Sequence, residues 1–306
     1  TDCTGSHAGA VVVSNTTSMS FFHRVHMSNN SCNGTECKGG AAKFSGTYAT
    51  VSNVSIHNNS APECGGLWVG GGWLPQGQIV LSDGVSNEEP YGTQVVVYNT
   101  VFADNVAQTG SGGALCVSAR PQIIMQGPSD SVVPGMPAAS VTLNPRTTVD
   151  VYNCRFLHNT AAANGGAVEV RQHAQGTMAN VVMDRNTATG VGGAISVGSF
   201  GGLKLASSTL RRNAAITGAA VAGWQEATLV VSNSTLADNR AAVSGGGVSV
   251  TQSALTMDSV TATRCVAGAG DGGVIAARDS SVNVTSLRAT NNTALNGGVL
   301  SANGNR

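Results

Sequence analysis

Apolar and polar residues alternate along short stretches of this chain, and these stretches return at nearly constant spacing. Alternation with a period of two is typical of β-strands that bury one face. The apolar partners lie two residues apart each time, as in Val149 and Val151, Leu203 and Leu205, Leu229 and Val231, Leu255 and Met257, and Val282 and Val284. No segment shows the 3.6-residue period of an amphipathic helix, so the pattern predicts an all-β fold.

Pairs of glycines repeat with the same spacing as the predicted strands. Pairs open at Gly39, Gly65, Gly112, Gly165, Gly192, Gly245, Gly272 and Gly297, and Gly218 marks a degenerate copy. The successive gaps are 26, 47, 53, 27, 26, 27, 27 and 25 residues, so all but two lie close to 27. A fixed period of this length is the sequence signature of a solenoid.

Residues at the same place in successive repeats form columns. An apolar column contains Met27, Ile56, Phe102, Phe156, Met183, Leu210, Leu236 and, more weakly, Ala262 and Ala289. An asparagine column follows three residues later, at Asn30, Asn59, Asn105, Asn159, Asn186, Asn213, Asn239 and Asn292, and only Cys265 breaks it. A unit of about 27 residues cannot bury an apolar face alone, but stacking units in parallel register can. We therefore expect a right-handed parallel β-helix of about eleven coils.

Two of the repeats carry a recognisable double motif. Phe102-x-x-Asn105 is followed by Gly112-Gly113-Ala114-Leu115, and Phe156-x-x-Asn159 by Gly165-Gly166-Ala167-Val168, while Gly192-Gly193-Ala194-Ile195 repeats the second part. These motifs resemble the Phe-x-x-Asn and Gly-Gly-Ala-aliphatic repeats of bacterial polymorphic outer-membrane autotransporters, over residues of about 27 to 300. The resemblance implies a pectin-lyase-like right-handed β-helix that forms a surface passenger or stalk, usually an adhesive one.

The two long gaps between glycine pairs are insertions at 70–92 and 118–147, which hold seven of the eight prolines. Both begin just after the strand that follows a glycine pair, so they should leave the rod from the same side. Each contains either a degenerate coil or a surface loop. Loops mounted on a rigid scaffold often bind partners, and the candidates for partner binding are Trp73, Glu88, Glu89 and Tyr91.

Seven cysteines imply at least one unpaired thiol or an intermolecular bond. Cys37 and Cys64 precede successive glycine pairs in adjacent coils and are the candidate disulfide, with Cys32–Cys37 as the competing pair. Cys265 occupies the asparagine column and should be a buried free thiol. No Cys-x-x-Cys spacing occurs, so a zinc site is not expected, and neither are other metals or cofactors.

Eight Asn-x-Ser/Thr sequons occur, and their positions suggest exposure. Asn29, Asn58 and Asn291 each directly precede the asparagine column, at a place that otherwise holds charged residues, and Asn283 lies between two inward valines. The candidate glycosylation sites are Asn15, Asn29, Asn33, Asn58, Asn283 and Asn291; the sequons at Asn53 and Asn233 lie in a second column of turn residues and are weaker. Exposed sequons together with cysteines favour a secreted eukaryotic glycoprotein carrying N-linked glycans.

Charge and composition narrow the function. The chain has 16 basic and 16 acidic residues, which argues against nucleic-acid binding, and its apolar runs are too short to insert in a membrane. Carbohydrate hydrolysis needs two facing carboxylates, yet the charged column Asn58, Asp104, His158, Arg185, Arg212, Asp238 and Arg264 never places two acids on neighbouring coils. Glu169, on the outward side of its strand, has no acidic neighbour, and Asp104 with His158 is the only acid–base pair.

The sequence thus predicts one β-helix domain over 1–306, belonging to a larger chain. It should be a non-catalytic extracellular stalk, filament component or adhesive surface whose partners are other protein subunits or surface glycans. The alternative is a carbohydrate-binding or carbohydrate-active β-helix, since that fold also supports polysaccharide lyases and hydrolases.

Overall fold

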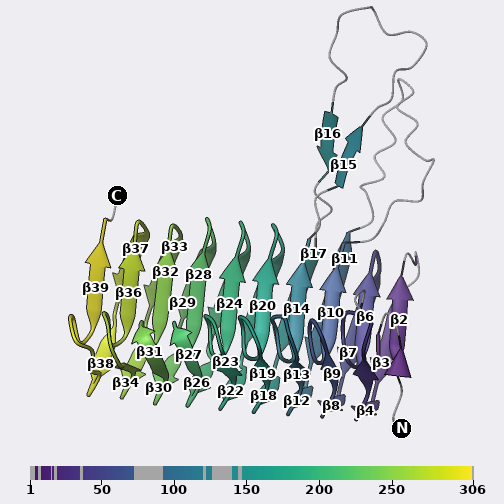
Figure 1. Ribbon diagram of the computed structural model, residues 1–306, viewed down its shortest axis with the longest axis horizontal. Helices are drawn as coiled ribbons and strands as arrows, with labels where there is room; N and C mark the ends of the chain where they lie inside the picture. Colours follow the sequence, from purple (N-terminus) through teal and green to yellow (C-terminus); the bar gives the residue numbers. More distant parts are fainter. Residues whose placement is uncertain are drawn as a thin grey trace, which may run out of the picture.

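The computed structural model describes residues 4–5, 8–14, 16, 19–34, 37–71, 92–119, 122–125, 140–143 and 147–304. Within them the chain winds into a parallel β-helix with coils of about 27 residues, and no helix is present (Figure 1). Four parallel sheets run along the rod, and a coil visits them in the order C, D, A and B. The predicted all-β solenoid is therefore confirmed.

Sheets C and D hold nine strands each. Sheet C consists of β3 (Ser20–His23), β7 (Tyr48–Ser52), β11 (Thr93–Tyr98), β17 (Thr147–Tyr152), β21 (Gln175–Ala179), β25 (Gly202–Ala206), β29 (Thr228–Ser232), β33 (Ala254–Asp258) and β37 (Ser281–Thr285). Sheet D consists of β4 (His26–Ser28), β8 (Ser55–His57), β12 (Val101–Ala103), β18 (Arg155–Leu157), β22 (Val182–Asp184), β26 (Thr209–Arg211), β30 (Thr235–Ala237), β34 (Thr261–Thr263) and β38 (Arg288–Thr290).

Sheet A holds nine strands and sheet B ten. Sheet A consists of β1 (Thr4–Gly5), β5 (Ser31–Cys32), β9 (Ser60–Ala61), β13 (Val106–Ala107), β19 (Thr160–Ala161), β23 (Thr187–Ala188), β27 (Ala214–Thr217), β31 (Arg240–Ser244) and β35 (Val266–Ala267). Sheet B consists of β2 (Val11–Ser14), β6 (Ala42–Ser45), β10 (Leu67–Gly70), β14 (Leu115–Ser118), β20 (Val168–Arg171), β24 (Ile195–Gly198), β28 (Val221–Trp224), β32 (Val248–Thr251), β36 (Ile275–Arg278) and β39 (Leu300–Asn303).

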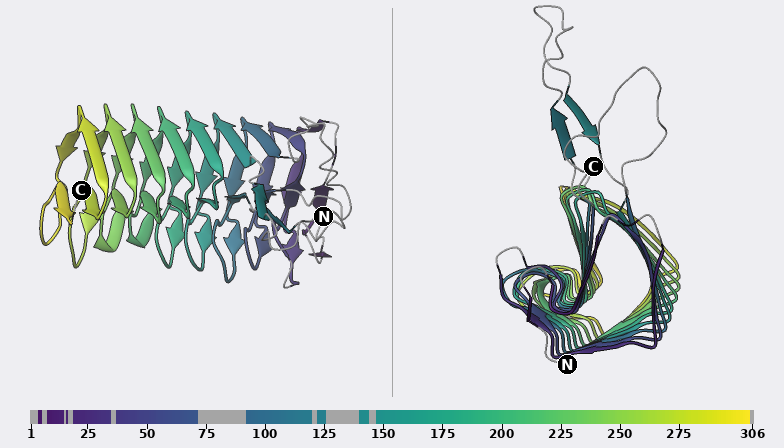
Figure 2. Two further views of the ribbon diagram at one scale, coloured as in Figure 1. Left: turned by 90° about the horizontal axis from the view of Figure 1, so that it is seen from above. Right: turned by 90° about the vertical axis from the view of Figure 1, so that its right-hand side faces the viewer.

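Seen along the axis, each coil encloses one large lobe and then curls into a smaller one (Figure 2). The large lobe holds the main core, in which inward aliphatic residues stack from coil to coil. Phe102 and Phe156 also stack there, with parallel rings whose centroids are 4.7 Å apart. A core this narrow is filled by stacked aliphatic side chains, which explains how a chain with only 4% aromatic residues can fold.

The asparagine column forms a buried ladder. The Asn159 amide Nδ2 donates to Asn186 Oδ1 at 3.0 Å, and the Asn186 Nδ2 donates to Asn213 Oδ1 at 3.0 Å. Each asparagine also holds the backbone, since Nδ2 of Asn186 donates to the Phe156 carbonyl and its own N–H donates to Asn213 Oδ1. The ladder runs from Asn30 to Asn239, where buried Cys265 interrupts it as predicted.

The residue before each ladder asparagine has a left-handed backbone, as at Arg185 with φ 56° and Arg212 with φ 55°. This conformation turns the chain sharply from sheet D into sheet A. The side chain of the left-handed residue then points outward, and the side chain of the asparagine that follows points inward. The ladder asparagines therefore fix a row of exposed side chains at a spacing of about 4.8 Å, the distance between paired strands.

The first residue of each glycine pair also has a positive φ, for example 62° at Gly165 and 70° at Gly192. The second packs against sheet A, because a Cβ on Gly166 would meet the backbone of Thr187. One alignment differs from the sequence prediction. Gly40 donates to the Cys64 carbonyl, so Cys64, with φ 65°, takes the first position in its coil and Gly65 the second.

No coil lies between the coils that flank each insertion. β10 pairs directly with β14, and β11 pairs with both β7 and β17, so the coils on either side of each insertion stack on one another. The degenerate-coil interpretation is wrong, and this is why sheets of nine or ten strands replace the expected eleven coils. Both insertions lie between a sheet B strand and a sheet C strand of adjacent coils, so their common side is confirmed, and the second contains an antiparallel hairpin of β15 (Gln122–Met125) and β16 (Ser140–Leu143).

Candidate functional site

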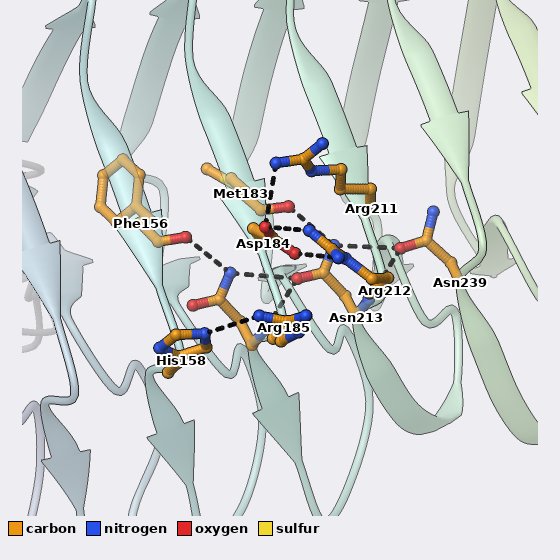
Figure 3. Close-up of polar contacts among 10 residues, drawn as sticks. Phe156, His158, Met183, Asp184, Arg185, Arg211, Arg212, Asn213 and Asn239 are labelled. Carbon is orange, nitrogen blue, oxygen red and sulfur yellow. Dashed lines mark hydrogen bonds and ion pairs between the residues drawn. The ribbon is translucent and has the colours of Figure 1, made fainter.

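Charged side chains from successive coils line the turn from sheet D to sheet A. We call this row, together with the neighbouring ends of sheets D and A, the arginine edge; it comprises Asp104, His158, Asp184, Arg185, Arg211, Arg212, Asp238, Arg240 and Arg264. Figure 3 shows its middle part, from His158 to Arg212. Because each coil contributes to the same place, side chains that are about 27 residues apart in sequence become neighbours.

Asp184 lies at the centre of the arginine edge and joins two arginines. Arg212 donates from Nε to Asp184 Oδ1 at 2.8 Å and from Nη2 to Oδ2 at 2.5 Å, and Arg211 reaches Oδ2 at 3.1 Å. Burial of Asp184 opposes ionisation, but the hydrogen bond from Arg212 and the charges of Arg211, Arg212 and Arg185 together lower its pKa below the ordinary value. The Asp184 carboxyl is therefore ionised at neutral pH and paired with Arg211 and Arg212.

Asp238 and Arg264 form the same two-point contact two coils further on, at 2.6 Å and 2.9 Å. The hydrogen bond from Arg264 lowers the pKa of Asp238. Together with Asp184 and Arg212, this pair shows that the turn geometry presents guanidinium groups in an orientation suited to planar anions.

Asp104, His158 and Arg185 continue the row toward the N-terminus. His158 Nδ1 lies 3.5 Å from Asp104 Oδ1, and Arg185 donates to His158 Nε2 at 3.5 Å. This contact shows that the second insertion, which lies between Asp104 and His158 in the sequence, does not separate them. No carboxylate in the described part of the chain lies within 4.0 Å of Arg185 or Arg240.

A second polar cluster is buried between sheet B and the small lobe. Glu169 is 1% exposed, although its outward position on the strand predicted contact with solvent. The expectation fails because the small lobe covers the outer face of sheet B, which also buries Trp68 and Cys116 (Figure 2). This arrangement was not visible in the sequence, since strand alternation does not reveal what covers each face.

Arg171 links Glu169 to Glu63, which lies two coils nearer the N-terminus. Its guanidinium contacts Glu63 and lies 3.4 Å from Glu169 Oε2, and Lys38 reaches Glu63 at 3.3 Å. Desolvation raises the pKa of Glu169 to about 7, while a hydrogen bond with Ser111 acts in the opposite direction. The strand neighbours of Glu169 in sheet B are Cys116 and Ser196, so no acid lies beside it in its column, as predicted, and its link to Glu63 runs through Arg171. The cluster is closed to a polymer substrate by burial.

A shallow depression of about 660 Å³ follows the turn from sheet B to sheet C, on the side where both insertions begin. It is lined by Ser199, Phe200, Gln225, Glu226, Gln252 and Asp279. The ring of Phe200 is 48% exposed and stacks on His173 with centroids 4.8 Å apart. Glu226 and Asp279 lie two coils apart with Gln252 between them, so this depression does not pair acids on neighbouring coils.

The structure corrects one predicted site and leaves another untested. Cys32 is bonded to Cys37, with Cα atoms 5.7 Å apart, so the Cys37–Cys64 pairing is wrong and the competing pair within one loop is formed. Cys64 takes the first glycine position of its coil and packs with Trp68 and Cys116, whereas Cys32 and Cys37 pack with Ala61 in a separate cluster. Trp73, Glu88, Glu89 and Tyr91 lie outside the described residues.

The sequon asparagines face solvent wherever the structure describes them. Asn29, Asn33, Asn58, Asn283 and Asn291 are exposed, and so are the weaker candidates Asn53 and Asn233, while Asn15 lies outside the described residues. Within the described ranges no group of three or more His, Cys, Asp or Glu residues could hold a metal ion. His26 and His57 approach each other instead, with Nε2 atoms 2.9 Å apart.

No protein-family model matches the chain, and no curated protein sequence matches it significantly. No helix in the described part of the chain is long and apolar enough to cross a bilayer.

Proposed function

We propose that this chain is a non-catalytic extracellular β-helix that acts as a rigid stalk, as a component of a surface assembly or filament, or as an adhesive surface. The observation that carries the proposal is the hydrogen-bonded asparagine ladder, which joins successive coils from Asn30 to Asn239 without a break. A ladder of this kind makes a straight, stiff support, because a coil cannot move without breaking buried hydrogen bonds to both neighbours.

An adhesive role is supported by the features on the surface of the rod. Two insertions begin on one side of the rod at adjacent coils, and the arginine edge runs along another side. Side chains on a regular solenoid can meet an extended partner at many points at once. The partners that we propose are other protein subunits and surface glycans.

An extracellular location is supported by the exposed sequons and by the disulfide between Cys32 and Cys37, since disulfides persist in oxidising compartments. We further propose that the chain is a eukaryotic counterpart of the autotransporter passengers that its repeats resemble, with N-linked glycans on the exposed asparagines. The solenoid fold is common to these passengers and to carbohydrate enzymes, so the fold by itself does not decide between them.

Incubation of the full chain with a panel of neutral and acidic polysaccharides tests the proposal. We expect no release of reducing ends or unsaturated sugars, and immunogold labelling should place the protein on the cell surface. Depolymerisation of any of these polymers that depends on the folded chain would contradict the non-catalytic role. An intracellular label would contradict the extracellular role.

A carbohydrate-active β-helix remains the second candidate because the depression beside Phe200 offers an exposed ring and two carboxyls. Ligand sites commonly combine aromatic side chains with a few polar groups. If this depression is catalytic, Glu226→Gln and Asp279→Asn should each abolish polymer cleavage while thermal stability is retained. If it only binds sugars, Phe200→Ala should weaken binding and no cleavage should be detected with the unmodified chain.

A further inference from the structure

The arginines of this chain are segregated, although its formal net charge is zero. Between residues 155 and 288, the outer faces of sheets D and A and the turn between them hold seven arginines, Arg155, Arg185, Arg211, Arg212, Arg240, Arg264 and Arg288, against two aspartates, Asp184 and Asp238. Acidic residues of the same coils lie elsewhere, with Glu226 and Asp279 on the turn from sheet B to sheet C and Asp258 at the end of sheet C. Neutrality of the whole chain therefore conceals a basic face.

The ion pairs within the arginine edge leave positive charge uncompensated. Asp184 forms ion pairs with both Arg211 and Arg212, and Asp238 forms an ion pair with Arg264. Arg185 has His158 as its hydrogen-bond acceptor, and within the described residues no carboxylate pairs with it or with Arg240. All of these guanidinium groups are exposed or close to solvent, so an external anion can reach them.

We propose that the arginine edge binds a linear anionic polysaccharide lying along the rod. This inference deepens the proposed adhesive role and rests on it. Three features favour such a ligand over other polyanions. The arginines follow a straight line, they repeat with the spacing of the coils, and threonine hydroxyls lie beside them.

The turn column advances by one coil at a time, so Arg185, Arg212 and Arg264 lie on a straight line at multiples of about 4.8 Å. A polysaccharide chain advances by a similar length per sugar, so an anionic group on each sugar can meet successive coils. The phosphates of duplex DNA wind around a helix axis and follow a straight edge for only a few steps. The described part of the edge also lacks the exposed aromatic rings on which unpaired bases stack.

The same edge offers partners for sugar hydroxyls and planar anions. Thr209, Thr235 and Thr261 pair directly in sheet D and form a row of half-buried threonines beside the arginines. Arg212 and Arg264 already hold carboxylates by two parallel hydrogen bonds, which is the geometry that carboxylate or sulfate groups on a glycan would use.

The sequons of the turn column lie on either side of the arginines. In the turn column, Asn29 and Asn58 lie before the arginines and Asn291 lies after them, while the four intervening coils from Arg185 to Arg264 carry no sequon in that column. N-linked glycans at those three asparagines would therefore be attached outside the row from Arg185 to Arg264.

Binding of the full chain to defined polymers tests the inference, with polygalacturonate as the carboxylated probe, dextran sulfate as the sulfated probe, and dextran and duplex DNA as comparisons. The test variant is Arg185→Gln combined with Arg240→Thr, and neither change creates a glycosylation sequon. Glutamine has the left-handed backbone of Arg185 at Gln172 and Gln225, and threonine occupies the Arg240 position at Thr160 and Thr187, so the fold already accepts both residues in these conformations. Arg278→Thr is the matched control, because Arg278 is exposed in sheet B and its partner position holds Thr251.

We expect at least one anionic polysaccharide to bind, with affinity that falls as salt rises, and dextran not to compete. The double variant should weaken binding by about tenfold or more and lower the slope of log affinity against log salt by about one to two. The Arg278→Thr variant should bind like the unmodified chain. Binding to polygalacturonate alone or to dextran sulfate alone identifies the anionic group and supports the inference in either case.

The inference is overturned if neither anionic polymer binds, if the double variant and the control lose affinity equally, or if DNA binds more tightly than both polysaccharides. These outcomes are separate from a failure of the proposed function. A surface-located chain that binds no polysaccharide loses only this inference, whereas a chain that binds and cleaves the polymer keeps the arginine edge as a binding site and loses the non-catalytic role.

Discussion

At the scale of single residues, each inner asparagine of the ladder joins its coil to both neighbouring coils, as Asn186 does. Asn186 accepts hydrogen bonds from both nitrogens of Asn159 and donates to Asn213 and to the Phe156 carbonyl, with no exposure to solvent. Removing one side chain therefore leaves several buried polar groups without partners, and each of these costs free energy.

We predict that Asn186→Ala lowers the free energy of unfolding by about 2–4 kcal/mol. The matched change in the opposite direction is Cys265→Asn, which completes the ladder between Asn239 and Asn292 and should raise stability by about 1 kcal/mol. Denaturant unfolding of both variants measures these shifts. Equal destabilisation by the two substitutions would show that the ladder is not what joins the coils.

Glu169 provides a residue-scale prediction with a pH dependence. Its pKa is raised from 4.5 to about 7 in the folded chain, so the native state binds more protons than the unfolded state between these values. The contribution of Glu169 to stability is therefore fully present below pH 4.5 and is lost as pH rises to 7, by up to about 3 kcal/mol. Glu169→Gln should flatten the stability profile in this window and raise stability at pH 8, as measured by denaturant unfolding at a series of pH values. A slope that survives in the variant would mean that another group causes it.

At the scale of the strand and turn, the glycine pairs have different requirements from glycines within strands. A Cβ at Gly192, where φ is 70°, would meet the backbone carbonyl oxygen of Ile195, whereas a Cβ at Gly176 would meet only side chains, at 3.4 Å from Leu203 and Val170. We predict that Gly192→Ala costs about 2–4 kcal/mol and that Gly176→Ala changes stability by less than about 1 kcal/mol. Thermal unfolding of the two variants side by side gives the comparison, and similar melting temperatures would contradict it.

The repeat pattern was sufficient to predict the strands because each coil has the same order of strands and turns. The apolar column, the inward asparagines and the exposed sequons all lie where period-two alternation and the turn positions placed them. The number of coils was overestimated because length alone cannot show whether an insertion of about 25 residues stacks in the rod or leaves it. The direct pairing of β10 with β14 depends on contacts between distant parts of the chain.

The candidate sites were harder to predict than the elements. The column containing Arg185, Arg212 and Arg264 was visible in the sequence, but Asp184 was missed, because it belongs to the end of a strand and not to that column. Burial of Glu169 and its link to Glu63 depend on how the small lobe folds over sheet B, and no local pattern encodes this. Cys64 was paired wrongly because its coil carries the glycine pair one residue out of register with the others.

At the scale of the whole molecule, regular stacking gives a rod whose surfaces repeat with the coil. The turn from sheet B to sheet C carries the insertions and the depression beside Phe200, and the turn from sheet D to sheet A carries the arginine edge. Separate surfaces on a stiff support suit a molecule that holds partners in fixed positions along its length. These separate surfaces support the scaffold role that we propose, because a glycoside hydrolase needs two acids facing one sugar.

The most direct test of the central claim is electron cryo-tomography of the native cell surface, with the chain located by gold-labelled antibody. The scaffold account predicts rods anchored in an ordered or fibrous extracellular layer, with their long axes in register with the surrounding polymer. A chain found as a free monomer that shortens acidic polysaccharide in the medium would contradict the account.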